Sequence, residues 1–285
     1  NAKVDFPRIK IFSAIGWIAG GVTLSWFKGE QSAIQFQIAA GASFLFGVFS
    51  LLLPHTPPKK VGQNVSLGEI LGLDALALMK KPSFAIFIGC MFLICIPLYF
   101  YFVLLSIYLS ELQWTNLAGK MTLAQVSDII FLFLLPVFLQ RLGYKKTIFI
   151  GILAWALRYF FLAQSVSSAD LAVPLIFGAI LLHGVCYDFL FIAGQLYVDS
   201  EANERIRGAV QGFIAFILWG VGALVGSYLA GKVLAANVLP VAQGTIAHQW
   251  KGIWLTPAIG ATVVMIIFLI FFREPLKKAV AGSTK

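Results

Sequence analysis

Three charged side chains lie deep within long apolar stretches of the sequence, and these are Asp128, Arg158 and Asp188. The other charged residues gather at or near the ends of such stretches. An ionisable group at the centre of a bilayer costs roughly 2.5 to 3.5 kcal/mol on insertion scales, so it usually faces a partner or a water-filled cavity. We therefore expect the function to be located around these residues.

Two pairs of polar side chains accompany the buried charges. Gln125 lies three residues before Asp128, and His183 lies four residues before Tyr187, so each pair shares one face of a helix. An amide beside a carboxylate can donate to and accept from hydroxyl groups or the edge of a base. Each pair also has an alternative interpretation without a role in binding. In it, Gln125 and Asp128 only bridge two helices, and His183 has only a structural role.

The elements that must position these groups are membrane helices. Hydrophobic residues make up 60% of the 285 residues, charged residues make up 12%, and mean hydropathy is +0.90, which leaves too little polar surface for a soluble domain. A helix needs ~20 residues to cross ~30 Å of hydrocarbon. The expected spans are residues 11–27, 33–54, 84–110, 121–140, 147–164, 171–198, 208–236 and 252–272.

The basic residues separate by side, with sixteen at one set of helix ends and four at the other. By the positive-inside rule the larger set is cytoplasmic, so both chain ends are expected inside. The net charge of +9 then reflects membrane topology and not nucleic-acid binding. The larger set is Lys3, Arg8, Lys10, Lys59, Lys60, Lys80, Lys81, Arg141, Lys145, Lys146, Arg205, Arg207, Arg273, Lys277, Lys278 and Lys285, and the smaller set is Lys28, Lys120, Lys232 and Lys251.

The longest connection, residues 55–83, separates two expected helices from the six that follow. Within it, residues 66–80 carry apolar side chains at helical spacing, which predicts an amphipathic helix at the inner membrane surface. The chain should therefore have three parts, residues 1–54, 55–83 and 84–285.

Small residues inside the apolar stretches are interpreted as packing residues. Cys90, Cys95 and Cys186 have neither CxxC spacing nor a ligand cluster around them, so no metal site is expected. Gly222 and Gly226 have the GxxxG spacing that lets two helices approach closely.

Several short segments carry a family resemblance. Residues 139–146 (LQRLGYKK) resemble the D-R-x-G-r-k loop of major facilitator superfamily transporters, although Gln140 replaces the usual Asp and puts the charge pair of that loop in doubt. A more specific resemblance is to the bacterial nucleoside permeases of the nucleoside:proton symporter family. The segments that carry it are 5–11 (DFPRIKI), 71–75 (LGLDA), 155–159 (WALRY) and 187–189 (YDF).

The resemblance implies an all-α bundle of the major facilitator type in the bacterial inner membrane, of which this chain supplies helices five to twelve. Residues 1–54 would be the last two helices of the N-terminal half, residues 55–83 the central cytoplasmic loop, and residues 84–285 the C-terminal six-helix half. Two helices of one half could not enclose a central pathway, so we expect further N-terminal helices in the native chain. The alternative is a complete eight-helix protein.

The resemblance also implies a substrate site. Gln125 and Asp128 match the Gln-x-x-acid pair at the family's nucleoside site, and His183 and Tyr187 match aromatic residues that stack on the base. Histidine at this position introduces a group that titrates near neutrality.

Departures from the family pattern extend this site. Ala14 and Trp17 replace Thr and Phe on the family's fifth helix, and Tyr99 and Phe102 replace Gln and Asn on its seventh. We expect Trp17, Tyr99 and Phe102 to line the cavity with an aromatic surface. Such a cavity would select less sharply for ribose hydroxyls, because polar specificity requires polar partners.

Asp188 matches the family's intramembrane acid and is expected to carry the coupled proton. Lys10 and Arg158 are the two cations within range, and Arg158 lies at a similar depth to Asp188. A cation whose distance from the Asp188 carboxylate changes with conformation would switch the protonation of that carboxylate. The alternative is a static ion pair that fixes helix packing.

These observations predict a secondary transporter that takes up a nucleoside or nucleoside-like solute by alternating access of two helical halves, with the proton as coupling ion and no other cofactor. Two alternatives stay open, a transporter of the same fold for another solute such as a sugar, and a non-transporting receptor or scaffold. An intramembrane aspartyl protease is disfavoured because Asp128 lacks the G-x-G-D context, so the chain is not expected to be an enzyme.

Overall fold

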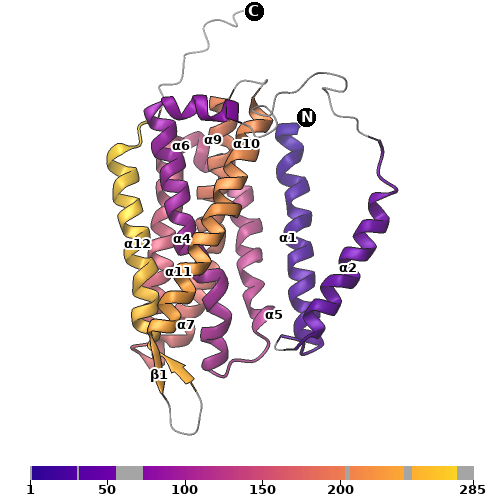
Figure 1. Cartoon of the computed structure of the whole chain (residues 1–285), viewed down its shortest axis with the longest axis vertical. Helices are drawn as coiled ribbons and strands as arrows, with labels where there is room; N and C mark the ends of the chain where they lie inside the picture. Colours follow the sequence, from indigo (N-terminus) through magenta and orange to yellow (C-terminus); the bar gives the residue numbers. More distant parts are fainter. Residues whose placement is uncertain (1, 31, 56–72, 203–205, 241–245, 275–285) are drawn as a thin grey trace, which may run out of the picture.

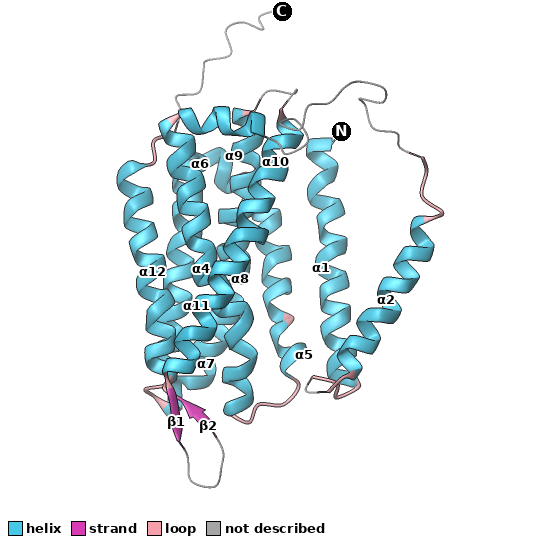
Figure 2. Cartoon of the chain, in the orientation of Figure 1, coloured by secondary structure: helices cyan, strands magenta, loops and turns pink. Residues whose placement is uncertain are grey.

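The computed structural model describes the chain except residues 1, 31, 56–72, 203–205, 241–245 and 275–285, and it describes residues 2–10, 73–75 and 246 by their backbone alone. The described residues form a bundle of roughly aligned helices with a short hairpin at one end (Figure 1, Figure 2). The start of α1 (Ala2–Trp26) and the end of α12 (Trp250–Phe271) lie at the same end of this bundle.

Between these two helices the described residues are almost all helical. The remaining elements are α2 (Ile34–Ser50), the 3₁₀ helix η1 (Leu73–Lys80), α4 (Pro82–Glu111), α5 (Leu117–Met121), α6 (Leu123–Ser165), α7 (Ala169–Leu181), α8 (His183–Tyr187), the π-helix η2 (Asp188–Ile192), α9 (Ala193–Glu201), α10 (Arg207–Ala215), the π-helix η3 (Phe216–Gly222), α11 (Ala223–Ala236), and the paired strands β1 (Val238–Pro240) and β2 (Ile246–His248).

Five helical segments of the described chain are long and apolar enough to cross a membrane. They are Pro82–Glu111, Leu117–Ser165, Ala169–Glu201, Arg207–Ala236 and Trp250–Phe271, and two shorter apolar helices cover Ile11–Trp26 and Ile34–Ser50. The apolar helical bundle expected from the sequence is confirmed at this level. The count of eight crossings stays a prediction.

The longest of these segments is interrupted at Gly143. Its φ of +73° and ψ of 179° are not helical, and glycine adopts such a positive φ without steric cost. Glu274 accepts hydrogen bonds from the backbone N–H groups of Tyr144 and Lys145 at 3.1 and 3.0 Å. The label α6 therefore covers two helices joined by a sharp turn, and they correspond to the two spans predicted on either side of residues 141–146.

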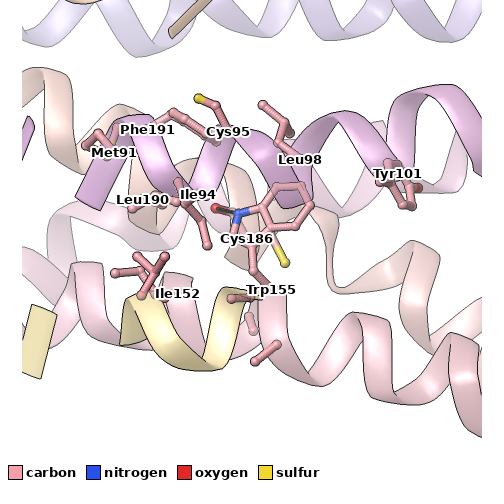
Figure 3. Packing of buried hydrophobic residues seen from close by; sticks show 14 of the residues in the cluster. Met91, Ile94, Cys95, Leu98, Tyr101, Ile152, Trp155, Cys186, Leu190 and Phe191 are labelled. Carbon is pink, nitrogen blue, oxygen red and sulfur yellow. Dashed lines mark hydrogen bonds between the residues drawn. The ribbon is translucent and has the colours of Figure 1, made fainter. Parts of the chain in front are cut away.

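The core lies where α6 packs against α8, η2 and α12, and where α4 packs against α11 and α12. Trp155, Tyr159 and Trp254 are completely buried and stack in sequence, with ring centroids 5.9 and 6.2 Å apart. Figure 3 shows Trp155 beside Cys186 at the centre of this packing. All three cysteines are buried and unbridged, which confirms their interpretation as packing residues.

The GxxxG pair of the penultimate span also packs as predicted. A Cβ at Gly222 would lie 2.8 Å from Cβ of Cys95, and a Cβ at Gly226 would lie 2.9 Å from Cβ of Tyr99. The two glycines therefore let η3 and α11 approach α4, and the packing hypothesis is confirmed.

The predicted amphipathic helix is only partly visible. Residues 66–72 of it lie outside the described residues, and Leu73–Lys80 form a 3₁₀ helix instead of an α-helix. Within that helix Leu78 is buried while Leu76 is exposed, so one side of the segment does contact the bundle.

Hydrogen bonds connect the turn after α1 to the start of α5. Glu30 Oε1 accepts from the backbone N–H of Ala118 at 2.8 Å and from the Ser25 hydroxyl at 2.5 Å. Ser25 Oγ in turn accepts from the N–H of Gly119 at 2.7 Å. The first N–H groups of a helix have no partner within it, so Ser25 and Glu30 cap α5 from a distant part of the chain.

A candidate substrate cavity

A cavity of about 590 Å³ lies between α1 and the bundle formed by α4, α5, α6 and α8. Its volume falls within the range of roughly 300–1,000 Å³ that is usual for small-molecule sites. Most of its wall is apolar, and polar groups reach it from only a few side chains, among them Ser13, Thr122, Gln125 and His183. This is the usual composition of a site that holds a small molecule in an apolar cavity and orients it by a small number of hydrogen bonds.

One wall of the cavity is a face of α1 that is rich in glycine. Gly16 and Gly20, one turn apart, both line the cavity, and a Cβ added at either would have no atom within 4 Å. Trp17 beside them is 65% exposed. Because glycine lets a ligand approach the backbone closely, this wall leaves room for a bound molecule.

Gln125 joins this wall to α6. With its amide oriented so that both polar atoms find partners, its Oε1 accepts from the indole N–H of Trp17 at 3.0 Å and its Nε2 donates to the carbonyl of Met121 at 3.3 Å. Trp17 and Gln125 were both predicted for the site, and the structure brings them into direct contact.

The opposite wall is aromatic. Phe102 and Tyr101 on α4 line it together with His183 on α8. The ring of His183 lies 6.0 Å from that of Tyr101 at an interplanar angle of 26°, and 5.5 Å from that of Tyr187 at 19°. Phe102 meets both Tyr101 and His183 at 67° and is the most exposed ring of this wall, so its face is the one available to a further planar group.

Close packing of α6 against α8 sets the position of His183. A Cβ at Gly184 would collide with the backbone carbonyl of Ser127, so only glycine allows this approach. The hydroxyl of Ser127 donates to the carbonyl of Leu181 at 2.5 Å and accepts from the N–H of Gly184 at 3.1 Å. These contacts place the Gln125–Asp128 turn next to the His183–Tyr187 turn.

Three of the predicted substrate residues stand beside the lining residues and not on the cavity wall itself. Tyr99 meets the edge of the Phe102 ring at 6.0 Å, and Tyr187 stacks on His183. Asp128 follows Gln125 by one turn of α6 and is 8% exposed. The structure thus gathers all seven predicted residues around one region, with Trp17, Phe102, Gln125 and His183 lining the cavity.

The residues predicted for proton coupling are less completely placed. Asp188 is completely buried as the first residue of η2, against which α6 packs so tightly that a Cβ at Gly151 would lie 2.8 Å from the backbone nitrogen of Leu190. Arg158 is also completely buried. Lys10 belongs to α1, but its side chain lies outside the described residues.

Sequence reasoning missed Tyr101 as a site residue, as it missed Ser13, Gly16 and Gly20 of the cavity wall. Tyr99 and Phe102 of the same aromatic run were considered because of the family pattern, whereas Tyr101 gave no signal of its own. A usable signal was the buried Arg158, because a guanidinium in an apolar environment needs aromatic or polar partners.

Comparison with known proteins identifies the family to which this arrangement belongs. A family model described as nucleoside H⁺ symporter matches residues 1–277. The chain belongs to the nucleoside H⁺ symporter family. The resemblance predicted from four short segments is thereby confirmed.

Relatives within the nucleoside H⁺ symporter family come from Escherichia coli (strain K12). The chain is 38% identical over 283 residues to YegT, a protein named as a candidate nucleoside transporter, and 30% identical over 303 residues to the nucleoside permease NupG. These alignments cover 96% and 98% of this chain but 66% and 68% of the relatives. A xanthosine permease is 30% identical over 292 residues, with 94% of this chain and 65% of the permease covered. The chain thus spans about two thirds of the length of these curated relatives.

Solved structures give the same relationship. Two crystal structures of the nucleoside transporter NupG, one of them of a mutant, superpose with TM-scores of 0.73 and 0.78 at 29% identity. Each covers 96% of this chain and 69% of NupG. This member of the nucleoside H⁺ symporter family therefore shares the transporter fold of NupG.

Proposed function

We propose that this chain takes up nucleosides or nucleoside-like solutes together with protons. The observation that carries the proposal is the cavity, in which a glycine-rich face of α1 lies across from an aromatic wall, in a chain of the nucleoside H⁺ symporter family. Such a slot suits a planar base. The permease names of the relatives support the same activity.

In this proposal the base lies between Gly16 and Gly20 on one side and Phe102 and His183 on the other. Stacking on an aromatic side chain contributes about 1–3 kcal/mol per base in single-stranded nucleic-acid complexes, and the same contact is available here. Gln125 supplies the amide that reads the edge of the base. Asp128, Tyr187 and Tyr99 support the lining residues from the adjacent turns.

Asp188 carries the coupled proton in this mechanism, and the cation that controls its protonation is Lys10 or Arg158. A buried carboxylate favours its neutral form unless a positive charge lies near it. When a conformational change alters the distance between Asp188 and this cation, Asp188 binds or releases a proton. Proton movement is thereby coupled to the movement of the two halves. The complete burial of Asp188 supports this role.

We further propose eight membrane crossings of the major facilitator type, with residues 1–54 in one helical half, residues 84–285 in the other, and residues 55–83 as the cytoplasmic loop between them. The sixteen-to-four division of basic residues supports a cytoplasmic location for both ends in a bacterial inner membrane. The common position of the start of α1 and the end of α12 supports an even number of crossings.

Cysteine labelling tests this topology. A membrane-impermeant thiol reagent added from outside should label Lys120→Cys but not Lys145→Cys, and inverted membranes should give the opposite result. The native cysteines are buried and supply little background. Labelling of Lys145→Cys from the outside of intact cells would show that the proposed orientation is wrong.

Uptake measurements with a cavity-filling variant test the function. The parent protein should accumulate labelled nucleoside when a proton gradient is imposed, and sugars should not compete. Gly16→Leu should reduce uptake at low substrate concentration about tenfold or more, because a loss of ~1.4 kcal/mol in binding is tenfold and the new side chain enters the open cavity. Gly231→Leu is the matched control, since Gly231 also has open space around it but does not line the cavity.

Two outcomes would contradict the proposal. A parent protein that accumulates no nucleoside, or one that prefers a sugar, would refute the assigned substrate class. Uptake by Gly16→Leu that equals uptake by the parent would show that nucleosides bind outside this cavity.

A further inference from the structure

Arg158 is a buried cation whose surroundings are mostly aromatic. It has no exposed surface, and its Nε donates to the carbonyl of Ala179 at 2.8 Å while its Nη2 lies 3.5 Å from the carbonyl of Ile180. Nη1 has no hydrogen-bond partner among the described atoms. A buried charge is costly unless it is compensated. The rest of the compensation comes from two rings, because the guanidinium carbon lies 3.9 Å from the centroid of Tyr101 and 4.8 Å from that of Trp155.

The contact with Tyr101 leads directly to the cavity. The ring of Tyr101 lies 6.0 Å from that of His183 at 26°, and the ring of His183 lies 5.5 Å from that of Tyr187 at 19°. Tyr101 and His183 both line the cavity. Arg158, Tyr101, His183 and Tyr187 thus form one continuous series of stacked groups, which we call the Arg158 stack.

The two hydrogen bonds of Arg158 hold the aromatic wall of the cavity through a second element, the helix α7. Ala179 and Ile180 belong to the last turn of α7, immediately before the break at Leu182 after which α8 begins with His183. A cation near the C-terminus of a helix interacts favourably with its carbonyl groups. Arg158 therefore fixes the end of the helix that precedes His183, in addition to its contact with the ring that stacks on His183.

We propose that Arg158 is a positioning residue of the substrate site, which holds Tyr101 against His183 and fixes the end of α7, so that the aromatic wall keeps the geometry a base requires. This inference rests on the proposed function and makes it more specific. It assigns Arg158 to substrate affinity.

Substitutions at Arg158 and Tyr101 in the intact protein separate affinity from coupling. Arg158→Lys keeps the charge but loses the planar face and the fixed pair of donors, and Arg158→Gln also loses the charge. Both should raise the KM for nucleoside uptake about tenfold, with the accumulation ratio at saturating substrate unchanged. Tyr101→Leu should raise the KM by a similar factor. In the double variant Arg158→Lys with Tyr101→Leu the loss of affinity should be smaller than the two separate losses combined, because part of the action of Arg158 passes through Tyr101.

Control measurements keep the outcomes distinct. Size-exclusion profiles and thermal unfolding show whether each variant is folded, and quenching of tryptophan fluorescence by nucleoside measures binding without transport. If no Arg158 variant folds, Tyr101→Leu alone decides the matter, and an unchanged affinity in this variant overturns the proposal. Loss of accumulation by Arg158→Gln at unchanged affinity, or strictly additive effects in the double variant, also overturns it. Absence of nucleoside binding by the parent protein would instead refute the proposed function.

Discussion

Asp188→Asn is expected to abolish the uphill accumulation of nucleoside while exchange of nucleoside across the membrane continues. Asparagine has nearly the shape of aspartic acid but cannot release a proton. Because Asp188 is completely buried at the start of η2, its neutral substitute should fit the same packing. Exchange at equal concentrations requires no net proton movement, so only the step driven by the proton gradient should be lost.

The measurement is uptake into membrane vesicles with and without an imposed pH gradient, followed by counterflow in the absence of a gradient. Asp128→Asn is the matched control, because Asp128 is also a buried carboxylate but lies one turn from the cavity residue Gln125. This control should bind nucleoside more weakly and still accumulate it. Accumulation by Asp188→Asn equal to that of the parent would move the proton site elsewhere, with Asp128 as the next candidate.

Gly184→Ala is expected to destabilise the protein and to impair nucleoside binding at the same time. The added Cβ would collide with the carbonyl of Ser127 and lie 2.8 Å from the backbone nitrogen of Asp128, so α6 and α8 would have to separate. Overpacking of this kind costs about 1–3 kcal/mol. The separation would also stretch the two hydrogen bonds of the Ser127 hydroxyl and shift His183 away from the cavity.

Thermal unfolding in detergent and quenching of tryptophan fluorescence by nucleoside measure the two effects. Gly89→Ala is the control, since Gly89 lies within α4 and a Cβ there has no atom within 4 Å. Alanine in place of a helical glycine stabilises by roughly 0.5–1 kcal/mol where it fits. A Gly184→Ala protein that unfolds at the same temperature as Gly89→Ala would show that the contact between α6 and α8 is not tight.

Hydropathy and motif spacing located the helices and much of the site. Trp17, Phe102, Gln125 and His183 were predicted and line the cavity. Gln125 and His183 were recognisable as polar residues within apolar helices, and Trp17 and Phe102 because they stand where the family carries other site residues. The packing role of the GxxxG pair was also predictable, since small residues at that spacing commonly let two membrane helices approach closely.

Orientation around each helix was much harder to predict. The helix α4 is apolar on every side, so periodicity could not show that Tyr101 faces the cavity and Arg158. Depth in the membrane placed Arg158 and Asp188 at a similar level, but depth does not fix direction around the helix axis. The π-helix that begins at Asp188 adds to the difficulty, because it departs from the period of 3.6 residues on which such predictions depend.

The hydrogen bonds that Ser25 and Glu30 make to α5 also carry a thermodynamic consequence. Under the proposed alternating access, α1 and α5 belong to different halves, so opening the protein at this end breaks the bonds to Ala118 and Gly119. A hydrogen bond to a charged group and one to a neutral group together contribute roughly 2 kcal/mol or more. Such a difference corresponds to a population ratio of about thirtyfold. The unloaded protein would therefore rest closed at this end, and part of the binding energy of an arriving solute would serve to shift that resting equilibrium.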